Sequence, residues 1–199
     1  MAEFDQKNQK VETQINAEKV VVYQGGEQKA PQKLSPLEEY LQILDARMTQ
    51  HGFRKLQQSR VDRVFHRKQI SVTKFGVVNT YCIIKYANED VTTDYLSSFS
   101  DLAFEVSNQN KSGAPSGLFA SLIVYSLTIA SNSVPEDVIR FLKAFTPQHF
   151  SSFEFPVVYE LSSKKLDYCM VTPSWGGFYY QGFRKEAERL FNPDEFRFA

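Results

Sequence analysis

The chain has 199 residues, 42% of them hydrophobic and 14% aromatic, which is enough apolar material for the core of one medium-sized domain. Basic and acidic residues number 23 each, so the net charge is zero, which excludes a global field that would draw the protein to nucleic acid or to an anionic membrane. No apolar run approaches the roughly 20 residues that span a bilayer, and the chain start lacks the apolar stretch of a secretory signal. We therefore expect a cytoplasmic protein with no membrane association.

Residues 1–34 are rich in Gln, Lys, Glu and Asn and contain one apolar run, Val20–Tyr23. This composition is typical of a flexible polar tail or linker, which we expect to be disordered. The alternative is that Val20–Tyr23 adds as a strand to a sheet edge, in this molecule or in another.

The first ordered element is expected at Ser35, where Ser35-Pro36-Leu37-Glu38 combines the spacing of a capping box with proline at the first helical position. Apolar residues then recur at helical spacing, and Gly52 suits the left-handed residue that ends a helix. In residues 61–86, β-branched and aromatic residues predict two strands of a hairpin that reverses at 74–76.

The next helices begin at Thr92 or Thr93 and at Ser133, which opens a second sequence with capping-box spacing. In chain order, the expected elements are a helix at 92–111, a strand at 118–130, a helix at 134–145, a hairpin at 155–171 and a helix after Gly176-Gly177. The strand at 118–130 is the most apolar stretch, which is typical of a central strand covered on both faces.

The resulting order is helix, two strands, helix, strand, helix, two strands, helix. It indicates an α+β domain of mixed α/β layers at residues 35–193, around a sheet of about five strands, with a short C-terminal tail at 194–199. Strands grouped in hairpins argue against a doubly wound parallel sheet, although the central helix–strand–helix segment can supply a parallel neighbour.

Residue types that carry catalysis or bind metals are few and scattered. Cys82 and Cys169 lie in separate apolar, strand-like runs, and no zinc-type spacing joins them to the three histidines. Neither cysteine stands where a thiolate would be activated, so we expect both to be free and buried. Glu154 and Glu160 could share a strand face for acid/base work, but Pro156 between them favours a solvent-facing edge strand. We predict no catalytic residue, no metal and no cofactor, and favour a protein that is not an enzyme.

Charge is unevenly distributed around the first hairpin. Residues 54–74 hold seven basic residues and one acid, whereas residues 86–106 hold five acids and no Lys or Arg. Two interpretations stay open: the segments pair with each other or stay solvated, or the hairpin contacts nucleic-acid phosphates. The contacts expected in the second case are Arg60, Arg63, Arg67 and Lys68.

That second interpretation includes a nucleic-acid-binding protein and a restriction-like, metal-dependent nuclease. A nuclease of this kind needs acidic metal ligands with a nearby lysine, and the short Glu/Gln-x-Lys matches in the sequence do not lie on the hairpin. The enzyme alternative therefore depends on whether four separate carboxylates converge in one cleft: Asp62, Glu105, Glu154 and Glu160.

Aromatic residues are densest near the C-terminus, where Thr172-Pro173-Ser174-Trp175-Gly176-Gly177 leads into Phe178-Tyr179-Tyr180. A lone tryptophan beside glycines at a strand-to-helix junction is the kind of rigid anchor enriched at interfaces. We predict a partner-binding set of Trp175, Tyr179, Tyr180 and Arg184. The alternative is that Trp175 and Tyr179 close the end of the core.

The pattern Phe155-Pro156-Val157-Val158, followed by Thr172-Pro173-x-Trp175-Gly176-x-x-Tyr179-Tyr180-x-x-Phe183-Arg184, resembles the C-terminal half of a family of conserved prokaryotic proteins. The resemblance extends back toward Ser35 and leaves residues 1–34 outside it. It implies no established activity. With no catalytic set in the sequence, we favour a non-catalytic domain that binds a protein partner or serves as an accessory regulatory module.

Overall fold

The computed structural model describes residues 34–71, 76–110, 120–149, 152–173 and 177–198. The chain divides between Leu34 and Ser35 into two compact units. The described residues other than Leu34 all belong to the second unit, and the apolar run Val20–Tyr23 lies outside them.

In the described residues, the second unit holds four α-helices, one 3-10 helix and seven strands. The helices are α2 (Pro36–Gln50), α3 (Thr93–Gln109), α4 (Glu136–Ala144), α5 (Gly177–Phe191) and the 3-10 helix η1 (Pro193–Phe198). The strands are β1 (Arg54–Leu56), β2 (Arg63–Ser71), β3 (Gly76–Ala87), β4 (Ala120–Ala130), β5 (Gln148–His149), β6 (Ser152–Glu160) and β7 (Lys165–Tyr168). The predicted α+β order is confirmed, with β1 and β5 as two additional short strands. Residues 194–198, expected as a tail, form most of η1.

All seven strands belong to one sheet of order β1-β2-β3-β4-β6-β5, and β7 also pairs with β6. β1, β2 and β3 are antiparallel neighbours, whereas β3, β4 and β6 are parallel. The parallel pairs arise because α3 and α4 each return the chain to the same end of the sheet before the next strand begins. β4 has long strands on both sides, as its apolar composition predicts.

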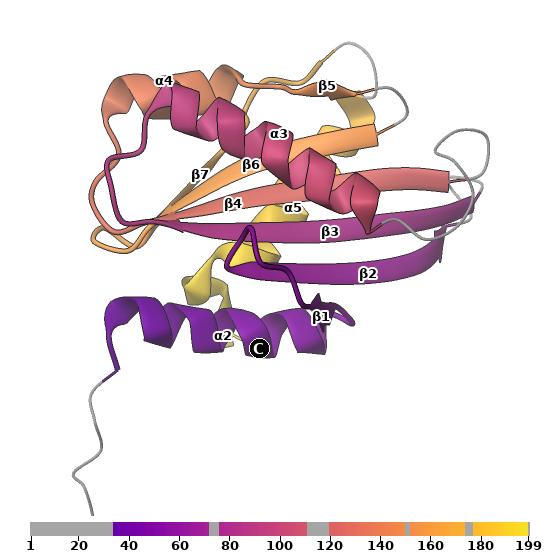
Figure 1. Ribbon diagram of the computed structural model, residues 1–199, viewed down its shortest axis with the longest axis horizontal. Helices are drawn as coiled ribbons and strands as arrows, with labels where there is room; N and C mark the ends of the chain where they lie inside the picture. Colours follow the sequence, from indigo (N-terminus) through magenta and orange to yellow (C-terminus); the bar gives the residue numbers. More distant parts are fainter. Residues whose placement is uncertain (1–33, 72–75, 111–119, 150–151, 174–176, 199) are drawn as a thin grey trace, which may run out of the picture. The chain divides into compact units, whose positions relative to one another are not determined.

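The helices form two layers on opposite faces of this sheet (Figure 1), with α3 and α4 on one face and α2 and α5 on the other. Side chains alternate along β4, so that Tyr125 packs on the α2–α5 face and Val124 on the α3–α4 face. The α2–α5 face is rich in aromatic rings: the Tyr125 ring makes edge contacts with Phe155 at 5.8 Å, Phe183 at 6.4 Å and Phe191 at 5.8 Å.

Two of the predicted helix caps are confirmed. Ser35 and Glu38 form the reciprocal hydrogen bonds of a capping box, and the Thr92 hydroxyl accepts from the Tyr95 amide at 3.1 Å. The predicted cap at Ser133 is wrong, because α4 has Pro135 at its N-cap position and no side-chain cap bond. The Glu160 side chain instead accepts a hydrogen bond from the amide of Val134, the residue before this N-cap.

The expectation that Glu154 and Glu160 lie on a solvent-facing edge strand is also wrong, since both are buried in β6 at 1% and 7% exposure. β6 has β4 along one side, while its other side is shared by β5 at Ser152–Phe153 and β7 at Val157–Glu160. Pro156, which has no amide proton to donate, falls in the gap between β5 and β7. A proline therefore fits inside the sheet without being on an edge strand.

Candidate functional site

Arg184 of α5 forms hydrogen bonds to the chain that follows β7, Cys169–Thr172. The Arg184 guanidinium donates to the carbonyl oxygens of Cys169 at 3.1 Å, Met170 at 2.7 Å and Val171 at 3.0 Å. It also donates to the Thr172 hydroxyl at 3.0 Å. A planar guanidinium suits this task because its five donors point along a fixed fork. Arg184 therefore fixes the backbone of this loop.

The same loop is attached to the end of α4, where the Lys143 carbonyl accepts hydrogen bonds from the amides of Met170 at 2.8 Å and Val171 at 3.2 Å. With their backbones bonded inward, Met170 and Val171 leave 55% and 46% of their surface exposed. Phe141 and Phe145 flank Lys143 in α4 and at its C-cap, with their rings stacked at 4.9 Å. We refer to Phe141, Phe145, Met170 and Val171 as the loop surface.

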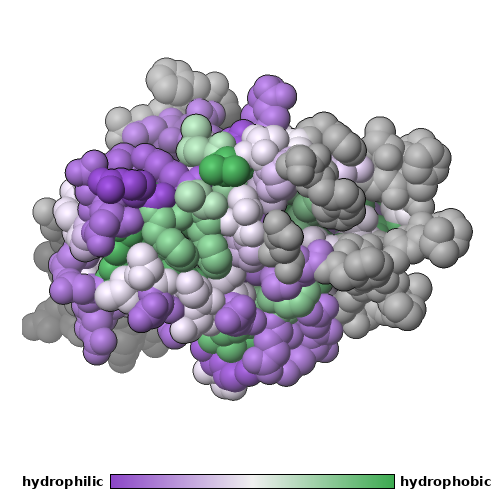
Figure 2. Space-filling model, turned by 90° about the horizontal axis from the view of Figure 1, so that it is seen from above, coloured by the Kyte–Doolittle hydropathy of each residue, from purple (hydrophilic) through white to green (hydrophobic). Residues whose placement is uncertain are grey.

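This surface is unusual among the described residues, where most large apolar side chains are covered. The strongly exposed ones are Leu34, Ile70, Met170 and Val171. Met170 and Val171 are the adjacent pair of this group. Viewed from above, on the side where α4 lies, the molecule has apolar side chains gathered in a patch with hydrophilic residues around it (Figure 2).

The structure separates the predicted partner-binding residues. Trp175 lies outside the described residues. Tyr179 is partly buried against Phe153 at 5.3 Å, and Tyr180 is 4% exposed within the core. Arg184 acts on the loop described above. Sequence reasoning missed Met170 and Val171, although two successive apolar residues at a strand end, where the inside–outside alternation stops, are a signal for them.

Three of the four basic side chains expected to contact nucleic acid are paired within the molecule: Arg60 with Glu105 at 3.0 Å, Arg63 with Asp45 at 3.6 Å and Arg67 with Glu186 at 2.5 Å. The Arg60–Glu105 pair joins the basic segment directly to the acidic one, so the interpretation of mutual pairing holds at this point. Lys68 is exposed on β2. Each of these three arginines thus has a carboxylate of the same molecule beside it.

The four carboxylates considered for a metal site have different partners. Asp62 accepts a hydrogen bond from the Tyr86 amide at 2.7 Å, and Glu105 pairs with Arg60. Glu160 accepts from the Val134 amide at 2.9 Å just before α4, close to where Ser133 was expected to cap the helix. Within the described ranges, no group of three His, Cys, Asp or Glu side chains is arranged to hold a metal ion.

Glu154 lies at the centre of a buried polar cluster on the α3–α4 face. Its carboxylate accepts hydrogen bonds from Ser100 at 2.5 Å and Ser126 at 3.1 Å, and the other oxygen lies 2.9 Å from Nε2 of His149. The His149 ring stacks on Phe104 with centroids 3.4 Å apart. Although serine, histidine and glutamate meet here, the carboxylate lies between hydroxyl and imidazole. In nucleophilic catalysis, the imidazole must contact the hydroxyl.

Glu186 forms a second polar cluster on the α2–α5 face. It pairs with Arg67 at 2.5 Å and accepts a hydrogen bond from Tyr125 at 2.7 Å. Burial and the Glu186 charge raise the pKa of Tyr125 well above its usual value, and the same two causes raise the pKa of the Cys82 thiol. Burial also raises the pKa of Cys169. Both free thiols are therefore held in their unreactive protonated form.

Comparison with known proteins assigns neither a family nor a function to the chain. No protein-family model matches the chain, and neither a curated protein nor a solved structure matches it significantly. Among the described helices, none combines the length and apolar character needed to cross a membrane.

Proposed function

We propose that the domain binds a protein partner through the loop surface. The observation that carries this proposal is the exposure of Met170 and Val171, at 55% and 46%, on a backbone bonded to Arg184 and to Lys143. A fixed backbone lowers the conformational entropy lost on binding, and a few fully desolvated side chains near the centre of an interface contribute most of its affinity. Methionine adapts readily to the shape of a partner surface.

Arg184 has an indirect part in this proposal. Its guanidinium positions the loop, so it is a positioning residue rather than a contact residue. Trp175, four positions beyond Val171 in the sequence, stays a prediction from the sequence alone. The wider role, as a non-catalytic interaction or accessory regulatory module, is part of the same proposal.

The first test uses the full chain with a photo-crosslinking amino acid in place of Met170, in extract from the native host. The matched control carries the same group in place of Ile70, which is 86% exposed on β2. We expect one protein to crosslink at position 170 and not at position 70. The same crosslinks at both positions, or none at position 170, would contradict the proposal.

The identified partner then allows a quantitative comparison of Val171→Asp with Ile70→Asp. A charge buried in an apolar interface costs several kcal/mol, so Val171→Asp is expected to weaken binding by at least about tenfold. Ile70→Asp is expected to bind like the wild type. Equal affinities of the two variants, with both folds intact by circular dichroism, would remove the loop surface from the interface.

Arg184→Lys separates positioning from direct contact. Lysine lacks the guanidinium fork, so the loop loses charge-assisted hydrogen bonds and the amides of Met170 and Val171 should exchange about tenfold faster with solvent, equivalent to ~1.4 kcal/mol. We expect partner binding to weaken in parallel. Weaker binding with unchanged amide exchange would instead indicate that Arg184 touches the partner.

A further inference from the structure

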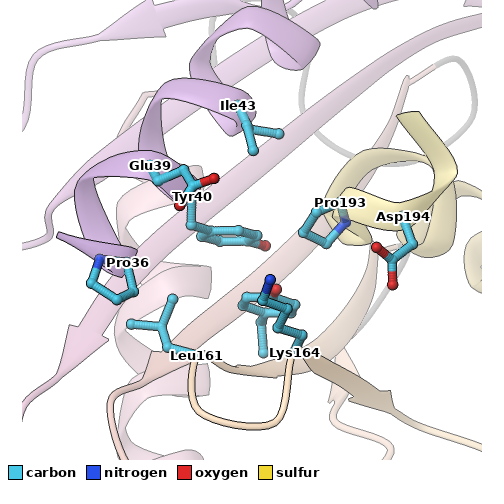
Figure 3. Close-up of a pocket in the computed structure, with 9 residues that line it drawn as sticks. Pro36, Glu39, Tyr40, Ile43, Leu161, Lys164, Pro193 and Asp194 are labelled. Atoms are coloured by element: carbon cyan, nitrogen blue, oxygen red, sulfur yellow. The ribbon is translucent and has the colours of Figure 1, made fainter. Parts of the chain in front are cut away.

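A cavity of about 260 Å³, which shares no residue with the loop surface, lies where α2, the β6–β7 turn and the start of η1 meet (Figure 3). Apolar side chains form its walls: Pro36 and Ile43 from α2, Leu161 from the turn and Pro193 from η1. The volume is just below the range typical of drug-sized ligand pockets, so a small metabolite is the largest class of occupant that fits.

Two stacked tyrosines form the floor of the cavity. The rings of Tyr40 and Tyr159 lie 4.1 Å apart and nearly parallel, and the residues are only 4% and 3% exposed. The Tyr40 hydroxyl donates to the Phe191 carbonyl at 2.8 Å. The Tyr159 hydroxyl has no hydrogen-bond partner anywhere in the described chain. Burial, with the charges of Asp194 and Glu39, raises the pKa of Tyr159 to about 12, which keeps this hydroxyl protonated and able to donate.

Three charged side chains line the rim: Glu39, Lys164 and Asp194. All three are exposed, and none forms an ion pair within the described residues. Figure 3 shows Glu39 and Asp194 on either side of the Tyr40 ring, with Lys164 below it. A ligand with a single charge would be repelled by one part of this rim, whereas a ligand with both signs would satisfy all of it.

Lys164 has a backbone conformation that supports a specific role. Its φ of 57° is in the left-handed region. Among the non-glycine residues that the structure describes, Lys164 alone has a positive φ. Glycine or asparagine would adopt this conformation with less strain. The strained position places an ammonium group at the cavity, and strain of this kind is often retained at binding sites.

We propose that this cavity binds a small zwitterion with an apolar body, of the class of free apolar α-amino acids. The ligand ammonium faces Glu39 and Asp194, its carboxylate faces Lys164, and its side chain packs on the tyrosine floor. The Tyr159 hydroxyl, on which the charges of Asp194 and Glu39 act, accepts a hydrogen bond from the ligand ammonium. This inference does not depend on the proposed protein partner, because the two sites share no residue.

Binding is tested with the full chain by NMR chemical-shift titration with the apolar L-amino acids valine, leucine, isoleucine, methionine and phenylalanine. Matched probes for leucine are isopentylamine, which has only the ammonium, and 4-methylpentanoate, which has only the carboxylate. We expect at least one amino acid to bind about tenfold more tightly than its single-charge analogues, since each charge-assisted bond contributes about that factor. No shifts with any amino acid up to about 10 mM, or equal binding of the analogues, would overturn the proposal.

Substitutions of cavity residues test whether the amino acid binds in this cavity. Lys164→Met is expected to weaken amino-acid binding about tenfold and Tyr159→Phe about threefold, while Lys185→Met, on the exposed face of α5, leaves it unchanged. Lys164→Gly relieves the left-handed strain, so this variant should stay at least as stable as the wild type while its binding weakens about tenfold, as in Lys164→Met. Unchanged binding by a folded Lys164→Gly variant would overturn the assignment of Lys164.

Discussion

Glu154 and Glu186 are largely buried carboxylates on opposite faces of one sheet, and their surroundings differ in charge. The Glu154 side chain, with no exposed surface, meets two serine hydroxyls and an imidazole. The Glu186 side chain, 16% exposed, meets the permanent cation of Arg67. Neighbouring residues of β4 serve the two sites, because Ser126 bonds to Glu154 and Tyr125 bonds to Glu186.

The difference shows that one strand can supply partners to two buried acids without bringing them together. At Glu186, removal of the carboxylate leaves a cation inside the protein, which is costly. At Glu154, removal of the charge leaves hydroxyl groups that still find an acceptor in an amide oxygen. Substitutions that keep the shape but remove the charge should therefore have unequal effects.

The largest effect is expected for Glu186→Gln. The glutamine amide group faces Arg67, whose side chain is 10% exposed, and cannot neutralise it. We expect the free energy of unfolding to fall by about 3 kcal/mol, as when one partner of a buried pair is removed. Equilibrium unfolding in urea measures this change.

The double variant Arg67→Met with Glu186→Gln serves as its control. It removes the unpaired cation, retains an acceptor for the Tyr125 hydroxyl, and should recover at least half of the lost stability. If the two substitutions change the free energy of unfolding additively, Arg67 and Glu186 are not coupled, and the expected difference between Glu186 and Glu154 is contradicted.

A smaller effect is expected for Glu154→Gln. The glutamine amide oxygen still accepts hydrogen bonds from Ser100 and Ser126, and its amide nitrogen takes the place of the carboxylate oxygen that faces His149. The loss should be about 1–2 kcal/mol, the scale of weakened hydrogen bonds to a charged group. The same urea titration measures it. A loss as large as that of Glu186→Gln would contradict the expected difference between the two carboxylates.

The smallest effect concerns pH and His51, whose carbonyl accepts a hydrogen bond from Arg67. Burial lowers the pKa of His51 below 6.5, and Arg189, Arg47 and Arg67 add to this effect. The unfolded chain therefore binds a proton more readily, so His51 contributes stability above pH 6.5 that is lost as the pH falls through the folded pKa. His51→Gln should therefore make the protein lose less stability between about pH 7.5 and about pH 5 than the wild type does. Unfolding titrations at both values test this, and an unchanged pH dependence would contradict it.

The order of elements could be predicted because it depends on local patterns. The capping box at Ser35, the cap at Thr92 and the apolar run of β4 each act within one element. The buried states of Glu154 and Glu160 could not be predicted, because their partners come from other elements. In the sequence, Pro156 close to Glu154 indicates an exposed edge strand. The hydrogen bonds from Ser100 and Ser126 that allow Glu154 to be buried come from other elements.

The candidate sites were less predictable for the same reason. Arg184 stands out in the sequence, but its acceptors lie 12 to 15 residues earlier in the chain. The cavity is built from three separate segments, represented by Tyr40, Tyr159 and Asp194, which no local spacing connects. The exposure of Met170 and Val171 depends on how α4 and α5 hold the loop.

The short strands at the borders of the sheet also bear on how the protein behaves at high concentration. β1, β5 and β7 have 3, 2 and 4 residues, and Pro156 interrupts the ladder on the outer side of β6. Long, unbroken edges are the surfaces on which sheets of different molecules join and aggregate. These broken edges offer few successive amides to another chain. Joining β5 and β7 into one long strand would therefore be expected to favour fibrous assembly.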